Sequence, residues 1–161
     1  MRKFHLVAIF TVFLCLSVRA EEPGTAIDTT VVKALAAGVS MDDAVESMKL
    51  RANLLNMKLV AEMHLSKQVE AMGETSRRIE IYQFCDPLTA MRLVEADIHI
   101  AAYLPCRIAL VEDEEGQGWL VMMNPEMMLS SANLTDELRE QAIRVKNDLL
   151  EIMGAGANGD L

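Results

Sequence analysis

The chain has 161 residues, with 15 basic and 24 acidic side chains and a formal net charge of −9 at pH 7. This length fits one domain with a sizeable core and is too short for two. The acidic balance argues against a nucleic-acid partner and against binding to anionic membranes. Aromatic residues are scarce, whereas the 12 methionines suit either a pliable aliphatic core or a surface for soft metal ions.

The first twenty residues are typical of an export signal. Arg2 and Lys3 precede an apolar run from Leu6 to Leu16, and Val18-Arg19-Ala20 ends the segment with a small residue. The run is shorter than the roughly 20 residues that cross a bilayer as a helix. We therefore predict that residues 1–20 are cleaved and take Cys15 with them. The mature protein is expected in the periplasm, free of the membrane, with 12 basic and 24 acidic side chains.

Residues 21–39 are small and polar, and we expect a partly flexible leader there. The first predicted helix begins at Ser40, whose spacing to Asp43 is that of a capping box. Apolar residues then recur at helical spacing, namely Val45, Met48, Ala52 and Leu55.

Residues 57–64 alternate in a period of two, which predicts a strand buried on one side. In this interpretation His64 lies on the more polar face. The opposite face packs under the helices and carries Met57, Leu59, Ala61 and Met63.

Further elements follow in chain order. A second strand is predicted over residues 78–84, and Asp86-Pro87 starts a short helix over residues 88–95. Residues 107–111 and 119–123 are predicted to form a β-hairpin whose loop is acidic and contains glycine. A last helix runs from Thr135 to Met153, with Gly154 as terminator, and residues 156–161 are expected to form a flexible tail.

Strands that interleave with helices and end in an antiparallel hairpin predict a single α+β domain. Its helices pack on one face of an antiparallel sheet. The other face is then left uncovered, and an uncovered apolar or mixed face on a small domain is usually a site for a partner or ligand.

Three sequence motifs resemble those of a known family. They are Phe84-Cys85-Asp86-Pro87, Leu104-Pro105-Cys106-Arg107-Ile108-Ala109-Leu110-Val111-Glu112-Asp113 and Asn124-Pro125-Glu126-Met127-Met128. The chain resembles the bacterial and archaeal family called domain of unknown function 302 over residues 40–155, particularly its exported members in sulfur-oxidising bacteria. The resemblance implies a TATA-binding-protein-like curved antiparallel sheet backed by two main helices. It also implies a homodimer and a link to sulfur oxidation.

Cys85 and Cys106 remain after export. In an oxidising compartment they indicate a disulfide, which could contribute on the order of 3 kcal/mol. Both cysteines are also close to prolines at predicted strand ends, where a reactive thiol, a persulfide carrier or a metal thiolate is the alternative. Their spacing is not CxxC, which argues against a zinc or iron–sulfur site built from this chain alone.

His64 and His99 also remain, and histidine is a common ligand of transition metals and haem iron. Neither lies in an HExxH or CxxCH motif, and a lone surface histidine usually has no such role. If His64 points into the uncovered face and His99 lines the same space, a flat cofactor such as haem b fits between two subunits. Its aromatic neighbours would be Tyr82, Phe84 and Tyr103.

Methionines cluster at Met122-Met123 and Met127-Met128, on either side of Asn124-Pro125. In the periplasm, paired thioethers can hold Cu(I). We favour core packing with one member of each pair inward, because adjacent residues of a strand point to opposite faces.

Three hypotheses follow, in this order. The first is a homodimer that binds a small ligand or haem on the open sheet face. The second is an accessory domain with a Cys85–Cys106 disulfide. The third is a thiol redox or sulfur-transfer protein, placed last because familiar enzyme motifs such as a phosphate loop or GxSxG are absent from the sequence.

Overall fold

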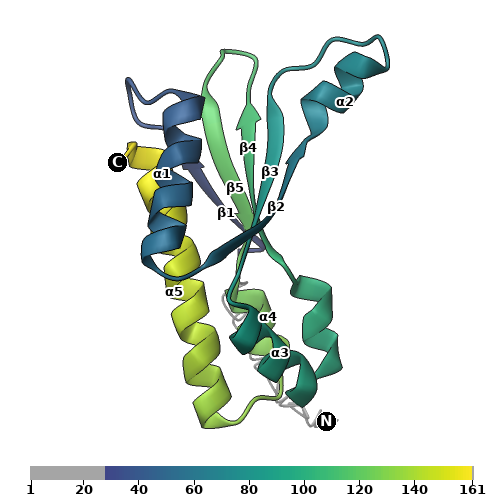
Figure 1. The fold of residues 1–161 in the computed structure, drawn as a ribbon, viewed down its shortest axis with the longest axis vertical. Helices are drawn as coiled ribbons and strands as arrows, with labels where there is room; N and C mark the ends of the chain where they lie inside the picture. Colours follow the sequence, from purple (N-terminus) through teal and green to yellow (C-terminus); the bar gives the residue numbers. More distant parts are fainter. Residues whose placement is uncertain (1–27, 161) are drawn as a thin grey trace, which may run out of the picture.

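The computed structural model describes residues 28–160, so the predicted signal and residues 21–27 lie outside the described residues. Five strands form one antiparallel sheet in the order β1-β5-β4-β3-β2. Their bounds are β1 Thr30–Ala34, β2 Lys58–His64, β3 Ile79–Cys85, β4 Cys106–Glu112 and β5 Gly118–Met123. Two long helices, α1 (Met41–Leu54) and α5 (Asp136–Asn158), lie side by side over one face of the sheet (Figure 1). The predicted α+β fold with helices on one face is confirmed.

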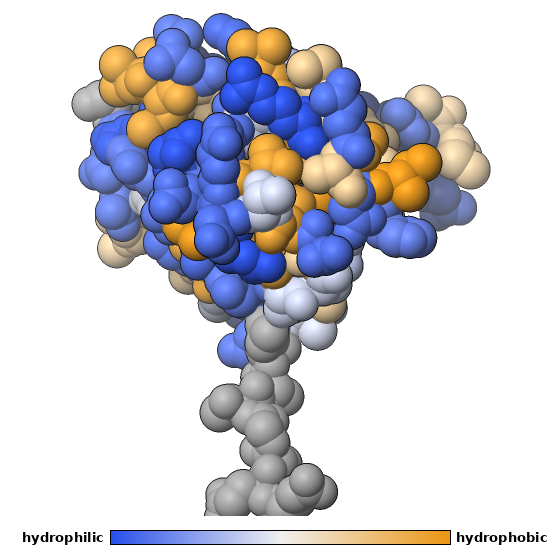
Figure 2. Space-filling model, turned by 90° about the horizontal axis from the view of Figure 1, so that it is seen from below, coloured by the Kyte–Doolittle hydropathy of each residue, from blue (hydrophilic) through white to orange (hydrophobic). Residues whose placement is uncertain are grey.

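The shorter helices α2, α3, η1 and α4 lie toward the two ends of the sheet (Figure 1). At one end is α2 (Leu65–Ala71), and at the other are α3 (Pro87–Ala96), the 3-10 helix η1 (Ile98–Tyr103) and α4 (Glu126–Ser131). Seen from the second end, the surface is mostly hydrophilic with separate hydrophobic patches (Figure 2). Among the described residues, no helix has both the length and the apolar character needed to cross a membrane.

The predicted caps explain where two helices begin. The Ser40 hydroxyl accepts a hydrogen bond from the backbone N–H of Asp43 at 3.1 Å, as expected for the start of α1. At α3, the Asp86 carboxylate accepts from the N–H groups of Leu88 and Thr89, while Pro87 occupies the first turn. Both helix starts are therefore confirmed.

Strand register places the core between the sheet and the two long helices. One row of cross-strand partners on this face runs Val31, Met122, Ile108, Tyr82 and Glu62. The next row runs Lys33, Leu120, Leu110, Glu80 and His64. Tyr82 and Phe84 are buried in this core. The aromatic side chains of β3 that we expected beside a cofactor on the open face therefore lie under the helices.

An apolar row crosses the opposite face of the sheet. Its five residues are cross-strand partners of one another, from β1 to β2. In this order they are Val32, Val121, Ala109, Ile81 and Met63. No helix of the described chain covers this row (Figure 1), and Val32 and Met63 at its two ends are 52% and 42% exposed. The uncovered sheet face expected from the sequence is present, and this row across it is apolar.

A β-bulge corrects the prediction for β2. Register shifts between Leu59 and Ala61, so Leu59 lies opposite the buried Phe84, whereas Ala61 and Met63 face the open side. An extra residue in one strand reverses the alternation of side chains beyond it. The prediction that Ala61 and Met63 pack under the helices is therefore wrong. His64 likewise lies on the helix-side face of the sheet, and not on the open face.

Both ends of the domain contain more regular structure than predicted. The strand β1 lies within the expected leader and pairs with β5 along its whole length. Helix α5 passes through Gly154 and ends at Asn158, and the cap residue Gly159 follows with a φ of +70°. The Ala157 carbonyl accepts a hydrogen bond from the Ala36 N–H at 2.8 Å. Residues 156–158 therefore continue the helix, with Gly156 and Ala157 buried, and the flexible tail expected from residue 156 does not begin there.

Two glycines in α5 provide a matched test of the contact between α5, α1 and the sheet. A Cβ on Gly156 would meet Met48 Cγ at 2.5 Å and Leu120 Cδ1 at 3.0 Å, whereas a Cβ on Gly154 would meet only Lys33 Nζ at 3.5 Å. We expect Gly154→Ala to stabilise the fold by up to about 1 kcal/mol through helix propensity. Gly156→Ala should instead destabilise it by about 1–3 kcal/mol through overpacking. Urea unfolding of the two variants measures both effects, and equal changes would contradict the close contact.

Candidate functional site

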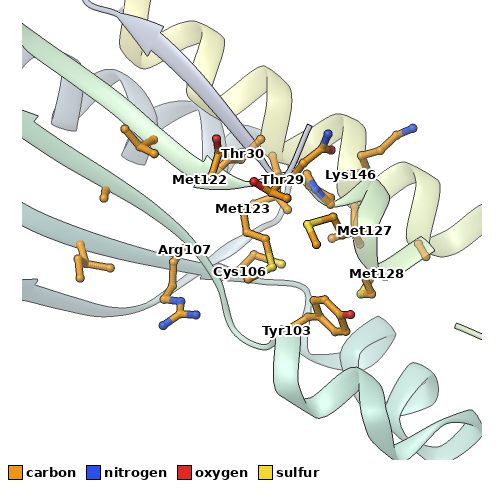
Figure 3. A pocket seen from close by; sticks show the side chains of 18 residues that line it. Thr29, Thr30, Tyr103, Cys106, Arg107, Met122, Met123, Met127, Met128 and Lys146 are labelled. Carbon is orange, nitrogen blue, oxygen red and sulfur yellow. The ribbon is translucent and has the colours of Figure 1, made fainter. Parts of the chain in front are cut away.

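A cavity of about 460 Å³ lies where β5 ends and β1 begins, against α4 and α5 (Figure 3). Ala109 and Val121 reach it from the open face, whereas Cys106 and Met122 reach it from the helix side. The cavity therefore extends around the ends of the strands. Its lining is mostly apolar.

Sulfur-bearing side chains from three elements converge on this cavity. They are Cys106 at the start of β4, Met122 and Met123 at the end of β5, and Met127 and Met128 in α4 (Figure 3). The turn that brings the two pairs together is held by the Glu126 N–H, which donates to Asn124 Oδ1 at 3.0 Å. The sequence showed the two methionine pairs but not that they share one cavity with Cys106.

The methionine pair of β5 has the predicted orientation. Met122 is 4% exposed and belongs to the core, whereas Met123 is 46% exposed on the other face of the strand. The prediction that one member of this pair points inward is confirmed. In α4, Met128 is buried and Met127 is half-buried.

Two positive side chains are the charged groups of the described lining. Lys146 of α5 is paired with Glu126 at 2.9 Å, and the Arg107 side chain is exposed at the start of β4. Uncharged polar side chains in the lining are those of Thr29, Thr30, Tyr103 and Asn124. No carboxylate belongs to the described lining, although the whole chain carries a net charge of −9.

Among the charged and polar residues of this lining, only Tyr103 was a site residue expected from the sequence. Thr30 belongs to a strand predicted as leader, and Lys146 belongs to a helix whose contact with β5 is not local in sequence. Of the three aromatic residues expected beside a ligand, Tyr103 lines the cavity.

The two cysteines are free thiols that lie on opposite faces of the sheet. Cys106 is the cross-strand partner of Phe84, so it faces the helices, and Cys85, one position further along β3, faces the other way. A bridge between them would require one side chain to cross the sheet. The disulfide considered from the sequence is therefore not formed in this structure.

The surroundings raise the pKa of both thiols. Burial, reinforced by the neighbouring Cys85, raises the pKa of Cys106 from its ordinary value of 9.0 to about 11. Burial and the Asp86 carboxylate also raise the pKa of Cys85. Since the thiolate is the nucleophile, this environment does not favour the reactive thiol that we considered.

The structure does not bring the two histidines together. His64 Nδ1 lies 3.0 Å from Glu80 Oε1, near the end of the sheet that carries α2. His99 is exposed in η1 near the opposite end (Figure 1). Neither histidine is among the cavity residues, and within residues 28–160 no three His, Cys, Asp or Glu side chains gather as a metal site. Haem binding stays a prediction from the sequence.

A buried carboxylate organises the end of the sheet near α2. Glu80 is 5% exposed and accepts hydrogen bonds from Tyr82 at 2.6 Å and Arg78 at 2.9 Å, with His64 also in contact. Burial alone would raise the pKa of Glu80, but the bonds from Arg78, Tyr82 and His64 outweigh it and lower the pKa from 4.5 to about 2. The ionised carboxylate is thus part of the folded structure.

This lowered pKa predicts a dependence of stability on acid. Because the pKa is lower in the folded state, the stabilisation is complete above pH 4.5 and is lost as the pH falls toward 2. We expect Glu80→Gln to reduce the free energy of unfolding by about 2–3 kcal/mol at pH 7. Its difference from wild type should shrink below pH 4.5, as measured by urea unfolding at several pH values. A difference that does not depend on pH would contradict the ionised state.

Together, these features define a small α+β domain with a sulfur-lined apolar cavity at one end of a sheet that is open on one face. The chain belongs to the DUF302 family: the family described as "Domain of unknown function DUF302" matches residues 32–155. A solved structure described as "Crystal structure of uncharacterized conserved protein DUF302 from Bacillus stearothermophilus" is similar, with a TM-score of 0.66 and 17% identity. The similarity covers 80% of this chain and 98% of that chain, and at this identity it establishes the fold. No curated protein matches the chain.

The environment of Cys106 predicts slow alkylation of the folded protein. In a Cys85→Ser variant of residues 21–161, Cys106 is the remaining thiol. A rise in pKa from 9.0 to about 11 lowers the thiolate fraction about a hundredfold at neutral pH. We therefore expect iodoacetamide to react about a hundredfold more slowly with the folded chain than with the urea-unfolded chain. Equal rates would show that Cys106 is neither buried nor perturbed.

Proposed function

We propose that this DUF302 domain binds a small apolar molecule in the cavity at the end of its sheet. The observation that supports this is the combination of volume and lining. A cavity of about 460 Å³ lies within the range of small-molecule sites, which is roughly 300–1,000 Å³, and such sites are mostly apolar with a few polar groups. Here those polar groups are the Arg107 guanidinium, the Lys146 ammonium and the Tyr103 hydroxyl.

The charges of the lining define the class of ligand further. Arg107 and Lys146 are positive, and Glu126 offsets the charge of Lys146. A cationic ligand would meet repulsion and find no carboxylate among the described lining residues. The ligand we propose is therefore an apolar molecule whose polar end is neutral or anionic.

Methionine suits such a site physically. Its unbranched side chain adjusts to irregular shapes, and its polarizable sulfur makes favourable contacts with aromatic groups. Four of the lining residues are methionines, and two of them follow a turn between β5 and α4. This lining can adapt to ligands of differing shape. We therefore expect the cavity to select ligands by their polarity more than by their shape.

The structural observations favour binding over thiol chemistry. Cys106 is the thiol in the cavity, and burial holds it protonated with a pKa of about 11. Export to the periplasm, a homodimer and a role linked to sulfur oxidation stay predictions. The apolar row from Val32 to Met63 is the surface that a second copy of the chain would cover in such a dimer.

A fluorescent apolar probe tests the proposal. We expect N-phenyl-naphthylamine to bind residues 21–161 with a rise in fluorescence and one site per chain. Thr30→Trp places an indole in the cavity lining, at an exposed strand position that tolerates a large side chain. It should weaken binding at least about tenfold, which is about 1.4 kcal/mol.

The matched control is Ala34→Trp, on the same strand and the same face but outside the cavity lining. Its affinity for the probe should stay within about twofold of wild type, a difference well under 1 kcal/mol. Equal effects of the two substitutions, or no saturable binding by the wild-type chain, would overturn the proposal. Circular dichroism confirms that both variants remain folded.

A further inference from the structure

Only one of the two positive side chains in the described lining of the cavity has a counter-charge. Lys146 is paired with Glu126 at 2.9 Å. Arg107 forms no ion pair and no hydrogen bond with any other described residue, whereas Arg77 and Arg78 are each paired with a carboxylate. The lining therefore carries a positive charge, that of Arg107, which the described part of the chain does not offset.

The surroundings of Arg107 on the sheet are uncharged. Its cross-strand partner on the open face is Gln83 of β3. The carboxylates of the five strands belong to Glu62, Glu80 and Glu112, and register places all three on the helix-side face. In a chain with a net charge of −9, this part of the open face is consequently free of strand carboxylates and can accept an anion.

We propose that Arg107 recognises a carboxylate at one end of the ligand, so that the ligand class is an aliphatic monocarboxylate. This inference rests on the proposed function and names the polar end of its ligand. A guanidinium binds a planar carboxylate through two parallel N–H···O bonds. The single charge of Arg107 matches one carboxylate, whereas a second carboxylate on the ligand would be left unpaired beside apolar side chains.

The position of Arg107 suits the head of an amphiphilic ligand. Its side chain is exposed and lies at the side of the cavity away from Lys146, with Met123 and Met127 between them (Figure 3). A carboxylate held at Arg107 keeps contact with water, which avoids the cost of burying a charge. The aliphatic chain enters the apolar lining, where each buried CH₂ group raises the affinity about fourfold.

Isothermal titration calorimetry with octanoate and octan-1-ol tests the inference on residues 21–161. The two probes share the same aliphatic chain length and differ in the charge of the polar end. We expect Arg107→Gln to reduce the affinity for octanoate at least about fivefold more than the affinity for octan-1-ol, because only octanoate loses a charge pair. Equal losses for the two probes would overturn the role of Arg107.

The matched control is Arg144→Gln. Arg144 is an exposed arginine of α5 outside the cavity lining, so its substitution removes the same charge from the chain. Its affinity for octanoate should stay within about twofold of wild type. If Arg144→Gln weakens octanoate binding as much as Arg107→Gln does, the effect is one of net charge and the recognition of a carboxylate by Arg107 is wrong.

This inference and the proposed function can be told apart by their failures. If octan-1-ol and N-phenyl-naphthylamine bind and Thr30→Trp weakens both, but octanoate does not depend on Arg107, the cavity binds apolar molecules and the carboxylate class is wrong. If octanoate depends on Arg107 but is unaffected by Thr30→Trp, the anion binds outside the cavity and the inference is overturned. If none of the three probes binds saturably, the proposed function and the inference are both wrong.

Discussion

The close approach of α5 to α1 and to the sheet is the constraint on which the rest of the domain depends. Gly156 has no side chain, and this lets the helix backbone reach Met48 of α1 and Leu120 of β5. With α5 at this distance, the two helices bury one sheet face, and the large side chains Tyr82, Phe84 and Ile108 lose contact with water. The same helix then carries Val145 and Lys146 to the end of β5, where they become part of the cavity.

Register decides which chemical groups the two faces of the sheet present. Cross-strand pairing aligns Val32, Val121, Ala109, Ile81 and Met63 into one apolar row on the open face. A single bulge in β2 determines that Met63 joins this row while His64 lies on the other face beside Glu80. One extra residue thereby removes a potential metal ligand from the open face and adds an apolar side chain to it.

The cavity exists because chain segments that are distant in sequence meet at the ends of β4 and β5. A short turn after Met123 reverses the chain into α4, so that four methionines and Cys106 surround one space. Flexible thioethers in an apolar space are compatible with an apolar molecule, which needs no charged ligand. Glu80 and His64 are engaged in structural contacts near the other end of the sheet, which carries α2.

The sequence by itself determined the local elements whose signals lie within a few residues. These include the capped start of α1 at Ser40, the start of α3 at Asp86-Pro87 and the hairpin of β4 and β5. The sequence motifs around Cys85, Cys106 and Asn124 also indicated the family, and the match over residues 32–155 confirms it.

Only the tertiary structure decided the pairing of β1 with β5, the bulge in β2, the full length of α5 and the faces on which Cys85 and Cys106 lie. Each of these depends on partners far away in the chain, and local propensity carries no information about such partners. The candidate site has the same origin. Its methionine pairs were visible in the sequence, but their convergence with Cys106 follows from strand register and from the packing of α4 and α5, which no local pattern encodes.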